Sequence, residues 1–193
     1  MNEFCLWLTG LPASGKTTLA LGLEKALKAY GFRPVVLDGD NLRQFLWPEL
    51  KFSREARQAQ AERATYLAKL IQQAGGIPIV ALISPYRADR AWAREQLKGF
   101  VEVYVDCPAG ICALRDPKDL WARARRGEIS QFTGVDDPYE EPLFPEIKVR
   151  THQQQPKGCC WFIIAKLVNL GYDLGHDSSD HPSAPSHGLG ERT

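Results

Sequence analysis

The sequence has almost no net charge and no long hydrophobic run. Its 24 Lys and Arg residues against 23 Asp and Glu residues leave a formal charge of +1, which gives no global field to hold duplex DNA or an anionic membrane. No stretch approaches the roughly 18 consecutive apolar residues that a membrane-spanning helix requires. We therefore expect no nucleic-acid partner and no membrane partner, and a local site must hold any bound anion.

Cysteine is also scarce and poorly spaced for cross-linking. The five cysteines are odd in number and form no C-x-x-C pair, so they indicate neither a disulfide framework nor a zinc site. Residues 1–8 contain no basic residue and no small-residue cleavage site, so they do not resemble a signal peptide. These features favour a reducing compartment, and we expect the protein in the cytoplasm.

What the sequence does contain suits an ordinary globular core. The 193 residues are 44% hydrophobic and 24% charged, which favours one domain with a short appendage. Apolar runs alternate with segments of helical periodicity, and this predicts an α/β fold with a parallel sheet covered on both faces. The expected strands are Phe4–Thr9, Pro34–Leu37, Ile77–Ile83 and Phe100–Val105, and the expected helices are Lys16–Tyr30, Asn41–Leu46, Arg54–Ala74, Arg87–Lys98 and Ala109–Arg115.

The C-terminal third is less regular. Residues 118–126 are basic and fit a short helix, whereas residues 127–145 mix Gly, Pro, Asp and Glu with few core residues. We interpret residues 116–145 as a mobile lid and call them the lid segment. Cys159–Leu170 is apolar enough to pack on the core as a strand or as a helix. Because apolar residues almost disappear after that, we expect a domain over residues 1–172 and a disordered tail over residues 173–193.

A phosphate-binding motif lies between the first expected strand and helix. Residues 10–17 match the P-loop pattern G-x-x-x-x-G-K-[ST], in which backbone N–H groups surround the phosphates, Lys16 bridges the β- and γ-oxygens, and the Thr17 hydroxyl binds Mg²⁺. The alternative is a glycine-rich turn with an exposed lysine. The chain has no N-K-x-D guanine signature, so we expect ATP. The candidate ATP-binding residues are Gly10, Leu11, Pro12, Ala13, Ser14, Gly15, Lys16, Thr17 and Thr18.

The motif sharpens the fold prediction and points to the opposite side of the site. It predicts a P-loop NTPase-type, three-layer α/β/α fold with a mainly parallel central sheet and a lid segment. Asp38, Asp40 and Arg43 follow the second strand. There a carboxylate can orient or deprotonate an acceptor hydroxyl or bind Mg²⁺ through water, and Arg43 can hold an anionic group. Alternatively, the two carboxylates only cap the next helix.

Three further residues have two interpretations each. Ser84 follows the third strand and is either a ligand or a helix cap. Arg57 and Gln60 are three residues apart on one expected helix and therefore share a face. They either grip a substrate together or belong to a solvated charged face.

Several segments, in order, resemble the adenylylsulfate kinase (APS kinase) family. They are FCLWLTGLPASGKTT (4–18), LDGDNLR (37–43), FS (52–53), ISPYRADR (83–90), FVEVYVDCP (100–108) and RRGEISQFTGVDDPYE (125–140). The resemblance runs from residue 4 to about residue 151. It implies that MgATP phosphorylates the 3′-hydroxyl of adenosine 5′-phosphosulfate (APS), giving 3′-phosphoadenosine 5′-phosphosulfate (PAPS) and ADP. It also implies a homodimer and functional coupling to ATP sulfurylase.

The resemblance assigns residues to the acceptor side. By position, the family's APS contacts fall on Asp40, Asn41, Leu42, Arg43, Phe52, Arg57, Gln60, Ile83, Ser84, Lys118 and Phe132. Phe52 and Phe132 would sandwich the adenine of APS, and the arm around Lys118 would close over both nucleotides. The candidate catalytic residues are Lys16, Asp38, Asp40 and Ser84, and the candidate Mg²⁺ residues are Thr17 and Asp38.

Two questions stay open on the sequence. Ser84 matches a serine described in the family as a phosphoserine intermediate, but direct in-line transfer needs no protein nucleophile. Asp119 and Trp121 stand where the family usually has Gly and Tyr, and Gln60 stands where it commonly has Asn. These departures leave two alternatives: a related kinase for another nucleotide-linked acceptor, or a non-catalytic nucleotide-binding module.

Overall fold

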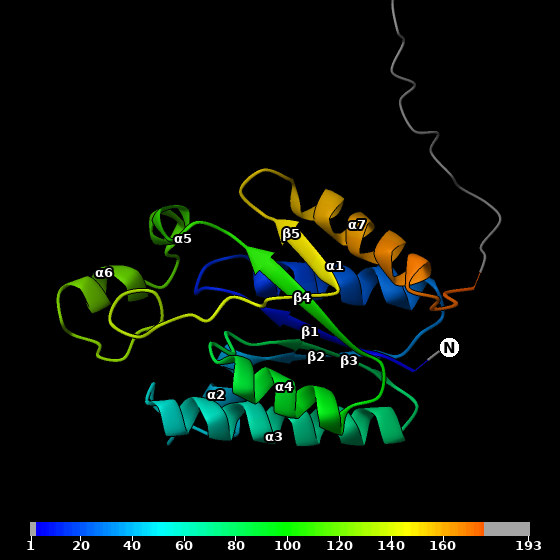
Figure 1. Ribbon diagram of the computed structural model, residues 1–193, viewed down its shortest axis with the longest axis horizontal. Helices are drawn as coiled ribbons and strands as arrows, with labels where there is room; N and C mark the ends of the chain where they lie inside the picture. Colours follow the sequence, from blue (N-terminus) through cyan, green and yellow to red (C-terminus); the bar gives the residue numbers. More distant parts are fainter. Residues whose placement is uncertain (1–2, 176–193) are drawn as a thin grey trace, which may run out of the picture.

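Five parallel strands form the central sheet in the order β2-β3-β1-β4-β5 (Figure 1). The computed structural model describes residues 3–175. The strands are β1 (Cys5–Thr9), β2 (Pro34–Asp38), β3 (Ile77–Ala81), β4 (Phe100–Asp106) and β5 (Ile147–Arg150). In the middle of the sheet, Leu8 pairs with Ala81 on one side and with Val103 on the other.

Helices cover both faces of this sheet and one of its ends. Helices α1 (Lys16–Ala29) and α7 (Pro156–Asn169) lie on one face, and α2 (Gly39–Phe45), α3 (Arg54–Gln73) and α4 (Arg87–Gln96) lie on the other (Figure 1). Helices α5 (Ala109–Arg115) and α6 (Leu120–Arg125) lie beyond the carboxyl ends of the strands. No helix in the described part of the chain is long and apolar enough to cross a membrane.

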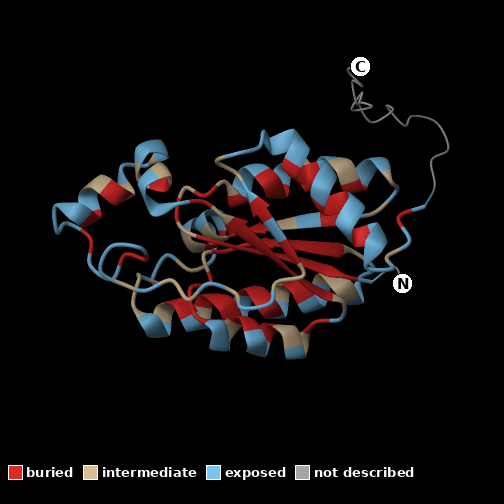
Figure 2. Ribbon diagram, turned by 45° about the horizontal axis from the view of Figure 1, so that its top comes forward, coloured by how far each residue is buried: buried red, intermediate tan, exposed pale blue. Residues whose placement is uncertain are grey.

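The central strand β1 shows why the sheet needs both helical layers. Because side chains alternate along a strand, Leu6 and Leu8 pack into the core beneath α1 and α7, whereas Cys5 and Trp7 pack into the core beneath α3 and α4. All five residues of β1 are buried, and the middle strands form the buried centre of Figure 2. The predicted α/β fold with a parallel sheet is therefore confirmed.

The region after residue 145 differs most from the sequence prediction. The apolar segment that fitted either a strand or a helix is helix α7, and it begins at Pro156 rather than at Cys159. Proline suits this first helical position because its missing N–H would have no partner there. Strand β5 was not predicted. It is a four-residue edge strand in which only Ile147 and Val149 are buried, so its apolar signal is short.

Smaller corrections concern element boundaries. Helix α2 begins at Gly39 instead of Asn41, because the Asp38 carboxylate caps it, and strand β3 ends at Ala81 instead of Ile83. Leu174, expected in the tail, is buried in the core with α1 and α7, so the folded part reaches at least this residue. The rest of the predicted tail, 176–193, lies outside the described residues.

The lid segment contains more core than the sequence suggested. Trp121, Ile129 and Phe132 are buried in a third apolar cluster, separate from the two beneath the helical layers. This cluster also contacts P-loop residues Leu11 and Ala13. Few core residues were expected over residues 127–145, where Ile129 and Phe132 are buried, and Trp121 of α6 adds a third buried side chain. Its mobility stays a prediction.

Candidate active site

A large cleft opens at the carboxyl ends of the strands, where ligands of open α/β sheets bind. Its volume is about 1190 Å³, more than the roughly 300–1,000 Å³ typical of a site for one small molecule. P-loop, β2–α2, α3 and lid residues line it together. The lining includes Pro12, Ala13, Gly15, Lys16, Thr17, Thr18, Asp38, Asp40, Asn41, Arg43, Phe52, Arg57, Gln60, Ile83, Lys118 and Phe132.

The P-loop has the backbone shape that its glycines allow. A Cβ atom on Gly10 would lie 2.6 Å from the Val105 carbonyl oxygen, so no larger residue fits between the loop and β4. Gly15 has a φ of 101° at the N-cap of α1, in the left-handed region that glycine adopts without steric cost. The loop therefore directs the N-terminus of α1 into the cleft, as phosphate binding requires.

Lys16 is folded into the loop. Its Nζ donates hydrogen bonds to the carbonyl oxygens of Gly10 at 2.9 Å and Leu11 at 2.7 Å. Only 9% of the residue is exposed, and burial lowers the pKa of the ammonium group to about 8. The alternative of a glycine-rich turn with an exposed lysine is therefore wrong. A phosphate anion in the cleft would supply the counter-charge that the buried lysine needs.

Thr17 and Asp38 form the junction between the P-loop and β2. The Thr17 hydroxyl donates to Asp38 Oδ2 at 2.7 Å, while Asp38 Oδ1 accepts from the backbone N–H groups of Asp40 and Asn41 at 3.1 and 3.2 Å. Asp38 thus caps α2, as one interpretation predicted, and it also faces the P-loop, while its chemical role stays a prediction. The adjacent hydroxyl and carboxylate oxygens are hard donors of the kind that Mg²⁺ prefers.

Asp40 differs from Asp38 in exposure and partner. Its Oδ2 atom accepts a hydrogen bond at 2.6 Å from Nζ of Lys118, in the lid segment. Both side chains are more than half exposed. This ion pair links α2 to the lid segment across the mouth of the cleft, and it leaves the second carboxylate oxygen of Asp40 without a protein partner among the described residues.

Arg43 and Gln60 hold each other in place. Arg43 Nη2 donates to Gln60 Oε1 at 2.6 Å, and Gln60 Nε2 donates to the Gly39 carbonyl oxygen at 3.0 Å. Burial lowers the pKa of Arg43, although a guanidinium group keeps its charge. Gln60 is buried, so its amide is a fixed part of the cleft wall. The solvated-face interpretation is wrong for this residue.

Arg57 connects α3 to the lid segment. The side chain is 3% exposed. Its Nε donates to the Phe52 carbonyl oxygen and its Nη2 to the Gln131 carbonyl oxygen, both at 3.0 Å. Asp137 lies 3.7 Å from Nε and supplies a counter-charge, while burial lowers the pKa of Arg57 to about 10. Arg57 therefore belongs to the cleft and not to a solvated face.

Two aromatic rings line the acceptor end of the cleft. Phe52 is partly buried and Phe132 is 1% exposed, and both pack in the third apolar cluster. The Arg43 guanidinium lies 4.8 Å from the centre of the Phe52 ring. The Trp121 ring meets Phe132 edge-on, with 5.4 Å between ring centres. These rings supply the flat apolar surface that a nucleobase needs.

Five predicted site residues do not line the cleft: Gly10, Leu11 and Ser14 of the P-loop, and Leu42 and Ser84 of the predicted APS contacts. Leu42 packs into the core beneath α3. Ser84 is buried, and its Oγ accepts a hydrogen bond from Trp7 Nε1 at 3.2 Å. Its neighbour Ile83 lines the cleft. The assignment of Ser84 to catalysis therefore stays a prediction, with the hydroxyl already engaged below the cleft wall.

The sequence prediction missed the segment after β5. Thr151 and residues 152–156 line the P-loop end of the cleft together with Arg115. Thr151 Oγ1 donates to the Ser14 carbonyl oxygen at 2.7 Å, and Arg115 Nη2 donates to the Thr151 carbonyl oxygen at 2.7 Å. The polar run Thr-His-Gln-Gln-Gln before Pro156 could have indicated that these residues line the cleft, but only once β5 is recognised as a strand that ends just before them.

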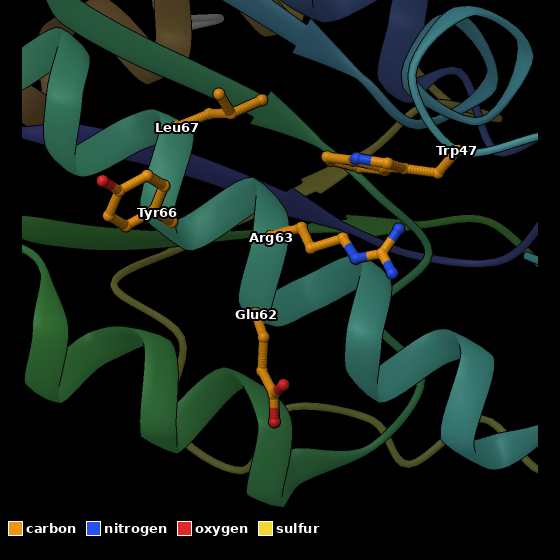
Figure 3. Close-up of a pocket in the computed structure, with 5 residues that line it drawn as sticks. All are labelled: Trp47, Glu62, Arg63, Tyr66 and Leu67. Carbon is orange, nitrogen blue, oxygen red and sulfur yellow. The ribbon is translucent and has the colours of Figure 1, made fainter.

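A second hollow lies away from this cleft, on the outer side of α3. It has a volume of about 360 Å³ and is lined by Trp47, Glu62, Arg63, Tyr66 and Leu67. Figure 3 shows the Trp47 ring above α3, next to the Arg63 side chain. The Arg63 guanidinium lies 5.7 Å from the ring centre. None of the predicted site residues lines this hollow.

Comparisons with known proteins of similar sequence or structure point to one family. The family model for adenylylsulphate kinase matches residues 2–150. The adenylyl-sulfate kinase of Clostridium acetobutylicum is 48% identical over 163 residues, which cover 84% of this chain and 82% of that one. The enzyme of the same name from Synechococcus sp. (strain JA-3-3Ab) is 44% identical over 167 residues, or 86% of this chain and 95% of that one.

A solved structure gives the same result. The APS kinase of Mycobacterium tuberculosis, determined in complex with AMPPNP and APS, superposes with a TM-score of 0.82 at 37% identity, covering 86% of this chain and 98% of that one. The predicted P-loop fold and the predicted kinase are thereby confirmed. With its P-loop and its cleft in the positions that the motifs predicted, the chain belongs to the adenylylsulphate kinase family.

Proposed function

We propose that the protein transfers the γ-phosphoryl group of MgATP to the 3′-hydroxyl of APS, giving PAPS and ADP. One observation carries this proposal: a single cleft joins a P-loop on one wall to Asp40, Arg43 and two phenylalanine rings on the other. Its volume of about 1190 Å³ suits two nucleotides side by side. Membership of the family adds the identity of the acceptor.

On the donor side, the P-loop N–H groups and Lys16 bind the β- and γ-phosphates. Mg²⁺ would be held by the Thr17 hydroxyl, by Asp38 through water and by phosphate oxygens, and it would neutralise charge on the transferred group. The 2.7 Å contact between Thr17 and Asp38 supports this placement. The described residues contain no group of three His, Cys, Asp or Glu that could hold a metal, which fits an ion held largely by its nucleotide.

On the acceptor side, Asp40 is our candidate base. Both oxygens of Asp38 already accept protein hydrogen bonds, whereas Asp40 is exposed to the cleft. Asp40 would take the proton of the 3′-hydroxyl while the oxygen of this hydroxyl bonds to the γ-phosphorus. The bond between the γ-phosphorus and the β,γ-bridging oxygen breaks in the same step, and ADP leaves. Arg43, Arg57 and Lys118 would hold the phosphosulfate, and Phe52 and Phe132 the adenine.

We place Ser84 outside the chemical step. Ser84 is only 6% exposed, and its hydroxyl accepts a hydrogen bond from the Trp7 indole. Phosphorylation of that oxygen would require the serine to leave a buried position. Direct in-line transfer needs only that both substrates occupy the cleft together.

The partners and compartment follow from the same proposal. Leu21 on α1 and Trp161 and Val168 on α7 each expose more than half of their surface, and an exposed apolar face of this kind supports a homodimer. APS must come from a reaction that joins sulfate to an adenylyl group, which supports coupling to ATP sulfurylase. All five cysteines are free thiols, which suits the reducing cytoplasm.

The test is an acceptor panel with purified protein. MgATP is mixed with APS, AMP, adenosine or no acceptor, ADP release is followed, and the product is identified by mass. We expect release that depends on APS and a product one phosphoryl group heavier than APS. Turnover with AMP but not APS would assign another nucleotide-linked acceptor, and ATP binding without any turnover would assign a binding module. Either result would overturn the proposal.

A further inference from the structure

We propose that Trp121 is a positioning residue that couples the ATP side of the cleft to the APS side. The inference rests on the proposed function, because it concerns two ligands in one cleft. Trp121 lies on α6 in the lid segment and is not among the residues that line the cleft. Its effect would therefore pass through the residues that it contacts.

The first contact reaches the P-loop. The indole Nε1 of Trp121 donates a buried hydrogen bond to the Pro12 carbonyl oxygen at 3.2 Å, across 109 residues of sequence. Pro12 lies in the phosphate-binding loop and lines the cleft. Trp121 is only 2% exposed, so water does not readily replace this bond and the loop position depends on the indole.

The second contact reaches the acceptor side. The Trp121 and Phe132 rings pack edge to face with 5.4 Å between their centres, and Phe132 lines the cleft. Gly134 closes the other side of the indole, because a Cβ atom there would lie 2.7 Å from Cη2 of Trp121. The ring therefore cannot shift without moving Phe132 or the turn at Gly134.

The backbone that carries Trp121 is itself fixed. The Asp116 carboxylate accepts from the N–H groups of Leu120 at 2.9 Å and Ala122 at 3.1 Å, which ties both neighbours of Trp121 to one side chain. The Trp121 ring is rigid, and it makes a polar contact with the P-loop and a packing contact with Phe132. Only one ring position therefore satisfies both contacts at once. A ligand that moves either contact changes the fit of the other, and such coupling is reciprocal.

The experiment measures that coupling by calorimetry on the full chain. The dissociation constants of MgAMPPNP and of APS are each determined alone and with the other ligand saturating. In the wild type we expect each constant to change by at least about fivefold when the second ligand is present. In Trp121→Phe, which keeps an aromatic ring but loses the N–H donor, we expect the change to fall below about twofold, with both ligands still bound.

A matched control and a second variant keep the test decisive. Trp92→Phe removes a partly exposed indole on α4 and should leave the coupling as in the wild type. If thermal melting shows that Trp121→Phe is unfolded, Trp121→Tyr replaces it, since it keeps a large aromatic ring but has no N–H donor for Pro12 and should lower the coupling too.

The outcomes separate this inference from the proposed function. Absence of APS binding to the wild type under every condition would overturn the proposed function, and the inference with it. Binding of both ligands without coupling, or with coupling that the folded variant retains in full, would overturn the inference alone. A purely structural role for Trp121 would lower the melting temperature and leave the coupling unchanged.

Discussion

The two walls of the cleft are built in different ways. The ATP side is built around one continuous loop, residues 10–17, with Arg115 and residues 151–156 beside it. The shape of the loop depends on backbone conformation and on the close approach of Gly10 to β4. The APS side combines side chains from α2, α3, the end of β3 and the lid segment. These lie up to about 90 residues apart in the sequence, and ion pairs and side-chain hydrogen bonds hold them together.

This difference follows from what each wall must recognise. Phosphate groups are common to all nucleoside triphosphates, and backbone N–H groups at a helix N-terminus suffice to bind them. A particular acceptor needs charges and rings at set positions, which only side chains from several elements supply. Substitutions on the ATP side should therefore abolish turnover, whereas most of those on the APS side should change acceptor affinity.

The largest effect is expected on the ATP side. Lys16→Ala should lower kcat by at least about 10³-fold, because it removes the cation nearest the transferred phosphoryl group. Turnover is measured as ADP release with saturating APS. Lys28→Ala is the matched control, since Lys28 is an exposed residue of α1 that pairs with Glu24. Unchanged turnover in Lys16→Ala would remove the basis for a P-loop kinase.

On the APS side, Asp40 is the residue whose substitution should lower kcat, as substitutions on the ATP side do. Asp40→Asn should lower kcat by about 10²-fold if Asp40 is the base, while the dissociation constant of MgAMPPNP stays the same. Asp106→Asn serves as the control, because that carboxylate pairs with Lys148 and Arg150 and does not line the cleft. A normal kcat in Asp40→Asn would return the role of base to Asp38.

The pH profile should also distinguish the two sides. Burial lowers the pKa of Lys16 to about 8 from its ordinary 10.5, so the free enzyme loses this charge above pH 8. We expect kcat/KM for ATP to fall about tenfold per pH unit there, while kcat at saturating ATP holds to higher pH because bound phosphate keeps the lysine charged.

Lys16 also contributes to the pH dependence of stability. Between pH 8 and 10.5 the unfolded chain binds a proton at Lys16 that the folded chain has lost, so this group alone raises the free energy of unfolding as pH rises. Burial raises the pKa of the Cys5, Cys112, Cys159 and Cys160 thiols, so these groups lower the free energy of unfolding in the same range, and the activity profile is the measurement that isolates Lys16. A kcat/KM profile that stays flat to pH 9.5 would contradict the assignment to Lys16.

A buried arginine tests the acceptor wall through affinity. Arg57→Lys keeps the charge but loses the fork that bonds to Phe52 and Gln131, so KM for APS should rise about tenfold, or about 1.4 kcal/mol. KM for ATP should change by less than about twofold. Arg54→Lys is the control, since Arg54 is an exposed residue that stacks on Tyr86. An equal rise in both KM values would contradict the division between the walls.

The smallest effect concerns the backbone of the lid segment. Asp119 has a φ of 56°, a left-handed conformation that costs a side-chain residue about 1 kcal/mol. Asp119→Gly relieves this cost but loses an exposed ion pair with Arg126, which contributes little to stability because water screens it. The free energy of unfolding should rise by about 0.5 kcal/mol, whereas Asp119→Ala should lower it. A free energy of unfolding lower in Asp119→Gly than in Asp119→Ala would contradict this account.

Sequence alone predicted the ATP side better than the rest of the site. The P-loop is a contiguous motif between two elements with clear periodicity, so Lys16 and Thr17 lie where the pattern placed them. The layered α/β fold was predictable for the same reason, since β1 is apolar throughout. The Asp38 carboxylate had two predicted roles, and the structure shows the cap of α2 together with a hydrogen bond from Thr17, while its role toward Mg²⁺ stays a prediction.

The parts that sequence reasoning missed depend on contacts between distant segments. Strand β5 is too short and too alternating to be distinguished from a loop, and without it the lining residues 151–156 have no predicted place. The burial of Trp121 depends on Pro12, Phe132 and Gly134, which no local pattern connects to it. Ser84 matched a motif, yet its hydroxyl bonds to Trp7 from a neighbouring strand.

The stereochemistry at the γ-phosphorus tests the central claim most directly. If ATP and APS occupy one cleft and the phosphoryl group passes straight between them, ATP made chiral at this phosphorus with oxygen isotopes should give PAPS with inverted configuration. Transfer through a phosphorylated protein residue such as Ser84 would involve two inversions. Retention of configuration in the product would therefore contradict direct transfer between the two walls of the cleft.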